Sequence, residues 1–124
     1  MMNCPCNTTK KYSDCCKKAH NDIFSVTTAE NLMRSRYSAF VLADIEYLQK
    51  SHHSKERPSR REKKEILRWT TSVSWMKLEI LNTTSTTVEF KAHYLENGIL
   101  KTIHENSYFT RENGHWVYVK GVHF

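Results

Sequence analysis

The sequence predicts an α+β fold in which N-terminal helices pack on a curved, four-stranded antiparallel sheet, with a small zinc knuckle at the start. Residues 29–67 show apolar side chains at helical spacing, whereas residues 69–124 alternate and are rich in β-branched and aromatic residues. These two patterns predict the fold class. Four cysteines lie within the first 16 residues and none in the remaining 108, which predicts the knuckle.

The composition indicates a single globular unit of 124 residues. Hydrophobic residues make up 39% and charged residues 26%, with only three glycines and two prolines, which excludes collagenous, low-complexity and wholly disordered classes. Apolar runs such as residues 37–43 are too short to span a membrane. Residues 1–6 lack the features of a signal peptide. We therefore expect a cytoplasmic protein with reduced cysteines and no membrane partner.

Residues 1–22 contain two close pairs of cysteines: Cys4, Cys6, Cys15 and Cys16. Grouped thiolates repel one another unless a cation neutralises them, and Zn²⁺ accepts four sulfurs in tetrahedral geometry. Such a site has no open position, so we expect a structural zinc. Disulfides, inert thiols or a redox role without a C-x-x-C motif are the weaker alternatives. His20 could replace Cys16 as the fourth ligand.

Two helices are expected after the knuckle. Thr27 and Glu30 match a capping box, and apolar side chains then recur at helical spacing from Leu32 to Val41. Asp44 interrupts this run, and a second short helix follows that ends near Ser51.

A third helix is expected in the basic middle of the chain. Residues 55–65 hold six basic and three acidic side chains, and Pro58 suits a first helical turn. The favoured interpretation is a solvated face with pairs such as Arg61 and Glu65. Contact with nucleic acid or an acidic partner is the weaker one, because no aromatic residues interleave with the charges. Zinc bound by four thiolates would also reduce the formal net charge from +6 to +4.

The rest of the chain predicts an antiparallel meander. Four strands are expected, over residues 69–81, 87–95, 99–111 and 115–124. The Asn-Gly dipeptides at 97–98 and 113–114 are strong hairpin signals. We expect Met76, Leu78 and Ile80 on one face of the first strand, and Trp75 on the other.

Two stretches of the sequence resemble known families. C-x-C-x8-C-C with an internal K-K-Y resembles the SEC-C zinc-binding motif, although Asn7, Thr8 and Thr9 replace its usual glycine and serine. The string LMRSRYSAFV at residues 32–41 closely resembles the YchJ family of bacterial proteins, and similarity continues at residues 88–92, 105–109 and 112–116. That family pairs a SEC-C motif with a domain of the nuclear transport factor 2-like, or cystatin-like, fold.

The resemblance implies a zinc-binding motif at residues 1–22 and a cone-shaped domain at residues 23–124 with a pocket at one end. Candidate pocket residues are Arg34, Arg36, Tyr37, Tyr47, His53, Glu105 and Tyr108. The two arginines could hold a buried carboxylate or an anionic ligand. The candidates include no convincing catalytic dyad, and the resemblance carries over no catalytic residue.

We therefore expect a non-enzymatic interaction module: a structural zinc motif joined to a domain that binds a protein or a small molecule. The first alternative is an isomerase, dehydratase or hydrolase that uses the pocket. The second is nucleic-acid contact through residues 55–64.

Overall fold

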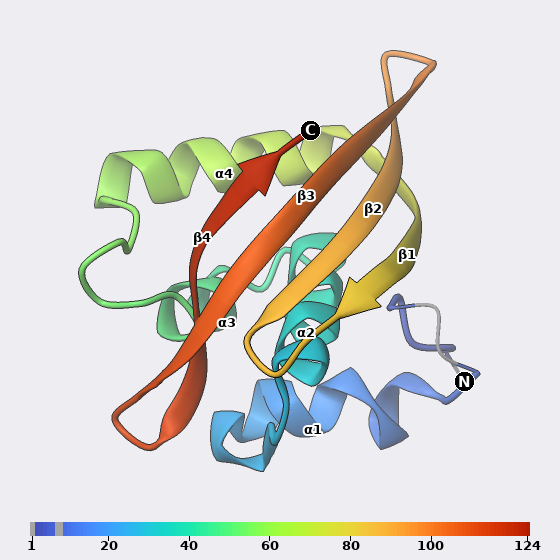
Figure 1. Ribbon diagram of the computed structural model, residues 1–124. Helices are drawn as coiled ribbons and strands as arrows, with labels where there is room; N and C mark the ends of the chain where they lie inside the picture. The colour runs from blue at the N-terminus through green and yellow to red at the C-terminus, as the bar shows by residue number, and fades with distance from the viewer. Residues whose placement is uncertain (1, 7–8) are drawn as a thin grey trace.

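The computed structural model describes residues 2–6 and 9–124, and it has the predicted α+β architecture (Figure 1). The described elements are η1 (Tyr12–Asp14), α1 (Cys16–Asn21), η2 (Ile23–Ser25), α2 (Ala29–Val41), α3 (Ile45–Lys50), α4 (Arg60–Ser72), β1 (Ser74–Thr83), β2 (Thr87–Glu96), β3 (Ile99–Glu112) and β4 (His115–His123). The helices lie together on one face of the sheet, with α4 across one end and α1 at the opposite end.

The strands form a meander in the order β1-β2-β3-β4, with every neighbouring pair antiparallel. Asn97 and Gly98 have φ values of 53° and 77°, and Asn113 and Gly114 have 54° and 85°. Two consecutive residues with positive φ form the tight hairpin turn that matches the twist of paired strands. Both predicted hairpins are therefore confirmed.

The helix starts differ slightly from the predicted ones. Thr28, not Thr27, caps α2, because its hydroxyl oxygen accepts the amide hydrogen of Asn31 at 3.1 Å. Asp44 both interrupts the first helix and caps α3, by accepting the amide of Tyr47.

Helix α4 begins later and ends later than the sequence predicted. Ser59 and Glu62 form a reciprocal capping box, so the helix starts after Pro58. It continues to Ser72, and the expectation of a strand from Trp69 is wrong. The ring of Trp69 packs edge-on against the ring of Trp75 in β1, with their centroids 5.4 Å apart. Trp69 therefore lies on the face of α4 that packs against the sheet, and this helix packing explains the apolar residue that the sequence pattern assigned to a strand.

The first strand also departs from simple alternation. Its pairing with β2 shifts between Trp75 and Lys77, so Met76 is an extra, bulged residue with 53% of its surface exposed. The expectation that Met76 shares a face with Leu78 is therefore wrong: Leu78 is buried and Trp75 packs against the core. The second strand alternates as predicted, with Val88, Phe90, Ala92 and Tyr94 buried.

One continuous core joins the knuckle, the helices and the inner face of the sheet. It includes Cys4, Cys6 and Cys16 together with Leu32 of α2 and Val88 of β2. The N-terminal segment therefore packs into the helical layer and contributes side chains to the same core.

Candidate functional site

The four cysteines come together at the N-terminal end of the helical layer. The amide of Cys4 donates to the carbonyl of Lys10 at 3.0 Å, which folds the first pair back onto the second. Cys15 lies between η1 and α1, and Cys16 is the first residue of α1. All four Sγ atoms lie within 4.8 Å of one another, and none of the four is in a disulfide. Three are buried and Cys15 is half-buried.

This arrangement fits a metal ion. A tetrahedral site with metal–sulfur bonds of about 2.3 Å has sulfur–sulfur edges of about 3.8 Å, and the Sγ atoms of Cys6 and Cys15 are 3.7 Å apart. Contact with Cys6 and burial raise the pKa of the Cys16 thiol well above its usual range. A cluster of thiolates is unfavourable here without a cation, so the four cysteines could hold a metal ion.

His20, the alternative fourth ligand, lies outside this cluster. Its Nδ1 is 2.6 Å from the hydroxyl of Tyr12, and its Nε2 is 2.8 Å from the carbonyl oxygen of Ser35. Both ring nitrogens therefore have partners, and His20 joins the knuckle to α2.

Two of the predicted pocket residues also hold the knuckle. Arg34 donates from Nη1 to the carbonyl of Cys6 at 2.8 Å and pairs with Glu30. The hydroxyl of Tyr47 is 2.7 Å from that of Ser35, and its ring packs against His20 at 4.6 Å. Neither is among the described residues that line the cavity discussed next.

A cavity of about 260 Å³ lies between the helices and the inner face of the sheet. Its walls are mostly aromatic and aliphatic: Met33, Tyr37, Phe40, Ile45, Leu48, Pro58, Ile66, Trp69, Trp75, Phe90, Ala92 and Ile103. The polar wall residues are Arg36, Gln49, His52, Glu105, Ser107, Tyr118 and His123. Such a ratio of apolar walls to a few converging polar groups is typical of small-molecule sites.

Glu105 of β3 organises one polar end of the cavity. Its Oε2 accepts hydrogen bonds from the hydroxyls of Ser107 at 2.6 Å and Tyr118 at 3.1 Å. Its Oε1 is 3.2 Å from Nε2 of His123. Burial, together with the charge of Glu105, raises the pKa of Tyr118, so this phenol stays protonated and donates.

Arg36 of α2 supplies a buried cation. Its Nη1 donates to the carbonyl of Leu48 at 3.0 Å and to the hydroxyl of Ser51 at 2.6 Å. Its guanidinium carbon lies 4.8 Å from the centre of the Tyr118 ring, a cation–π distance. Burial lowers the pKa of Arg36 to about 10, so the side chain still carries its charge at neutral pH.

The segment after α3 places His52 in the cavity wall and His53 outside it. Residues 51–53 bond to Tyr118 of β4 through the carbonyl of Ser51 and the amide of His53, both at 2.8 Å. The His52 ring packs edge-on against Tyr118 at 5.1 Å. Burial and the charge of Arg36 lower the pKa of His52 to about 4, so it is neutral at pH 7.

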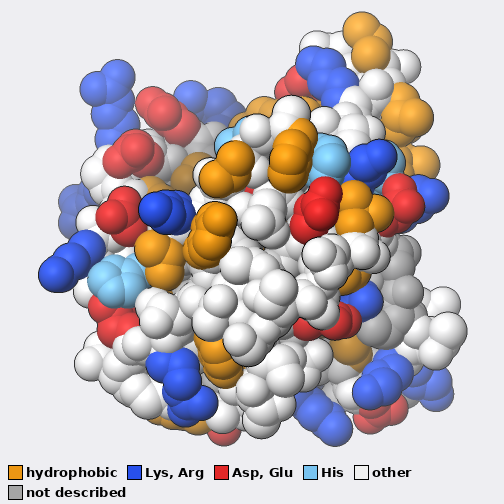
Figure 2. Space-filling model, in the orientation of Figure 1, with side chains coloured by type: hydrophobic (Ala, Val, Ile, Leu, Met, Phe, Trp, Pro, Cys, Tyr) orange, Lys and Arg blue, Asp and Glu red, His pale blue; other side chains and the backbone are white. Residues whose placement is uncertain are grey.

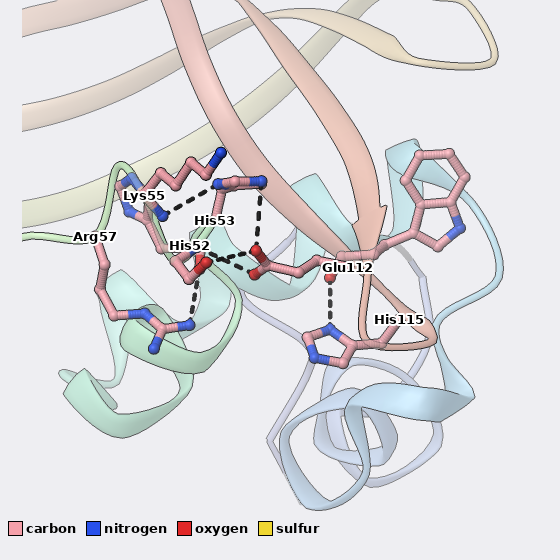
Figure 3. A network of polar contacts seen from close by, with 8 residues as sticks. His52, His53, Lys55, Arg57, Glu112 and His115 are labelled. Carbon is pink, nitrogen blue, oxygen red and sulfur yellow. Dashed lines mark hydrogen bonds and ion pairs between the residues drawn. The ribbon is translucent and has the colours of Figure 1, made fainter.

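His53 belongs to a surface network on the β3–β4 hairpin (Figure 3). Its Nε2 is 3.4 Å from Oε2 of Glu112, which also accepts the hydroxyl of Ser54 at 2.6 Å. Arg57 donates to the carbonyl of His52 at 3.0 Å. This network fixes the loop that presents His52. Tyr108, another predicted pocket residue, is 36% exposed and faces Lys120.

The structure thus brings three predicted pocket residues, Arg36, Tyr37 and Glu105, to one cavity. Sequence reasoning missed His52, Ser107, Tyr118 and His123 as residues that line this cavity. Strand parity carried a signal for Ser107, which shares the face of Glu105. Tyr118 and His123 depend on the register of β4, which shifts at the bulge beside Tyr108.

The basic segment forms the outer side of α4. The expected pair of Arg61 and Glu65 is present at 3.5 Å, and Lys63 contacts Glu46 at 3.3 Å. Figure 2 shows acidic side chains interspersed with the basic ones on this part of the surface. No helix among the described residues is long and apolar enough to cross a membrane.

Known proteins are similar to this chain in sequence. The family model described as "YchJ, middle NTF2-like domain" matches residues 28–121. A UPF0225 protein of Vibrio parahaemolyticus is 38% identical over 127 residues, which cover 96% of this chain and 74% of that protein. A UPF0225 protein of Streptomyces coelicolor is 40% identical over 95% of this chain and 93% of its own length.

Two solved structures are also similar. The solution structure of RPA3114, a SEC-C motif containing protein from Rhodopseudomonas palustris, has a TM-score of 0.78 and 30% identity, with 98% of both chains covered. The crystal structure of a SEC-C motif containing protein from Psychrobacter arcticus has a TM-score of 0.75 and 27% identity, and covers 94% of this chain and 80% of that one.

Proposed function

The chain belongs to the YchJ (UPF0225) family, and from that premise we propose that it is a zinc-stabilised binding protein whose cone-shaped domain holds a small organic molecule. The cavity of about 260 Å³ carries this proposal, because its apolar walls converge on a few fixed polar groups. The cysteine cluster supports the structural part of it. The protein's role is binding, and it needs no chemical step.

Zinc is the metal that the donor set favours. Four sulfur ligands are typical of structural zinc sites, and they leave no position for a substrate or a water nucleophile. Four lysines flank the cysteines and offset the formal charge of −2 that zinc with four thiolates carries: Lys10, Lys11, Lys17 and Lys18. The metal would hold the two cysteine pairs together while α1 and α2 pack around them.

Elemental analysis tests the metal directly. Protein purified without chelator should contain one zinc per chain, and Co²⁺ substitution should give the absorption of a tetrahedral thiolate site. A zinc content near zero in protein whose four thiols are intact and reduced would contradict this part of the proposal.

Ligand binding can be tested by filling the cavity. Ala92 lines it from β2, and Ala92→Leu places three more carbons in open space. Fragments that shift the amide resonances of cavity residues in wild-type protein should no longer do so in this variant. Thr110→Leu, on an exposed position of β3, is the matched control and should keep the shifts. A fragment library that shifts no cavity resonance in the wild type would reject the binding role.

A second candidate is a proton-transfer enzyme, because Glu105 and Tyr118 form a titratable pair at 3.1 Å inside the cavity. The hydroxyls of Ser107 and Tyr118 already donate hydrogen bonds to Oε2 of Glu105. Because this oxygen is occupied by the protein's own donors, the arrangement favours a binding role over proton transfer to or from a ligand. The enzymatic role predicts solvent deuterium incorporation into a bound ligand. Incorporation by the wild type and its loss in Glu105→Gln, at unchanged affinity, would support catalysis.

A further inference from the structure

The cavity contains a cation that the described residues leave only partly bonded. A guanidinium has five N–H donors, and the two hydrogen bonds of Arg36 both come from Nη1. The three donors on Nε and Nη2 therefore make no hydrogen bond with the described residues. Among the described residues, the buried side-chain nitrogen that lacks a hydrogen-bond partner is Nε1 of Trp116. The free donors of Arg36 are therefore not sealed in the protein interior, and they open to the cavity that Arg36 lines.

Apart from its contact with the Tyr118 ring, the charge of Arg36 has no directly bonded anionic partner among the described residues. Its hydrogen-bond acceptors are a backbone carbonyl and a hydroxyl, both neutral, and no carboxylate of the described residues lies within 4.0 Å of it. Glu105 acts on Arg36 through its charge without bonding it directly, and Ser107 and Tyr118 already occupy its Oε2. Buried charges are normally paired. Arg36 is 7% exposed, so bulk water offers it little compensation.

The other walls of the cavity determine which hydrocarbon body and which total charge a bound anionic ligand can have. Trp69, Trp75 and Phe40 form adjoining aromatic contacts at 5.4 and 6.1 Å, which suit a planar hydrocarbon body. A dianion is disfavoured, because His52 is neutral at pH 7 and Glu105 adds a negative charge. A cation is disfavoured by Arg36 itself. The cavity volume accommodates about ten to thirteen non-hydrogen atoms at roughly 20 Å³ each.

We propose that the cavity takes a small aromatic monocarboxylate, whose carboxylate accepts the free N–H donors of Arg36 while its ring packs against Trp75 and Phe40. This inference rests on the proposed binding role of the cavity. The planar fork of arginine matches a carboxylate with two parallel hydrogen bonds, which a neutral amide cannot reproduce.

The test compares three probes that share a benzyl group on the full chain purified with its metal: phenylacetate, its isostere phenylacetamide, and the cation phenethylamine. Calorimetry and amide chemical shifts should give phenylacetate a dissociation constant on the order of 0.1–1 mM, typical of about ten heavy atoms. Phenylacetamide should bind at least tenfold more weakly, and phenethylamine should cause no shift in cavity resonances.

Variants of Arg36 assign the selectivity to its side chain. Arg36→Met should abolish the preference for phenylacetate over the amide. Arg36→Lys keeps the positive charge but lacks the planar pair of N–H donors, so it should reduce the preference to about threefold. If Arg36→Met does not fold, the lysine variant alone tests the assignment. Arg68→Met removes one exposed positive charge from α4 and should leave the preference unchanged.

The outcomes separate this inference from the binding role. If the amide binds within threefold of the carboxylate, or if Arg36→Lys keeps the full preference, the carboxylate inference is overturned while the cavity still binds ligands. If no probe shifts a cavity resonance at millimolar concentration and the wider fragment library also fails, both proposals are rejected.

Discussion

Gly121 of β4 is the position where a single methyl group should disrupt the polar end of the cavity. It pairs with Ser107 of β3, and a Cβ added to it would lie 1.8 Å from Oε2 and 2.2 Å from Cδ of Glu105. Real Cβ atoms do not approach other atoms so closely, so in Gly121→Ala the Glu105 side chain must leave its place. The backbone of Gly121 is not left-handed, and the effect is therefore purely steric.

The expected cost follows from the hydrogen bonds that Glu105 would lose. Hydrogen bonds to a charged group contribute about 1.5–3 kcal/mol each, and Glu105 accepts two, from Ser107 and Tyr118. The contact with His123 adds little, because that side chain is 69% exposed. Glu105 can find partial solvation after it moves, so we expect Gly121→Ala to lower the free energy of unfolding by about 2–4 kcal/mol.

Urea denaturation of a double-mutant cycle measures this directly. In a Glu105→Ala background the clash is gone, and Gly121→Ala should then cost less than about 0.5 kcal/mol. Gly98→Ala is the control: it meets no atom within 4 Å but has φ +77°, so it should cost about 1 kcal/mol in both backgrounds. An equal cost of Gly121→Ala with and without Glu105, or a cost below about 0.5 kcal/mol in the wild type, would show that the clash with Glu105 is not the cause.

Three further changes have predictable effects. Cys16→Ser should lower the midpoint of the whole calorimetric transition, because Cys16 belongs to the same core as Leu32; an unchanged midpoint would contradict this. His52 has a folded-state pKa of about 4, below its unfolded value, so its contribution of about 2 kcal/mol is complete above pH 6.5 and lost as the pH falls toward 4. In His52→Gln, urea denaturation should therefore show a smaller loss of stability over that interval than in the wild type. Ser59→Ala removes the α4 capping box and should cost about 1 kcal/mol in the same assay, whereas Ser72→Ala at the other end of α4 should cost less.

Local rules in the sequence predict most of the secondary structure. The two Asn-Gly turns fix the register of β2–β3 and β3–β4 near each hairpin, because only residues that tolerate positive φ close a two-residue loop. The alternation in β2 follows from its position in the middle of the sheet, where one face meets the helices. The cysteine spacing likewise indicates a cluster of thiols that could hold a metal ion before any tertiary contact is known.

Register shifts account for most of what the sequence did not reveal. A bulge moves every later residue of a strand to the opposite face, and nothing in the local pattern marks Met76 as the extra residue. The same effect in β4 brings Tyr118 and Gly121 onto the face of Glu105. The polar end of the cavity is therefore a product of strand pairing, which is a tertiary property.

Helix α2 explains why the string from Arg34 to Tyr37 combines such different side chains. Successive residues of an α-helix point about 100° apart, so four consecutive positions face nearly every direction. Arg34 and Ser35 bond the knuckle through Cys6 and His20, whereas Arg36 and Tyr37 line the cavity. A single turn of helix thus positions both sites. Because α2 carries both sets of residues, a displacement of α2 at the cysteine cluster also moves the guanidinium of Arg36, and a metal held by the cysteines would contribute to the shape of the cavity although it lies outside it.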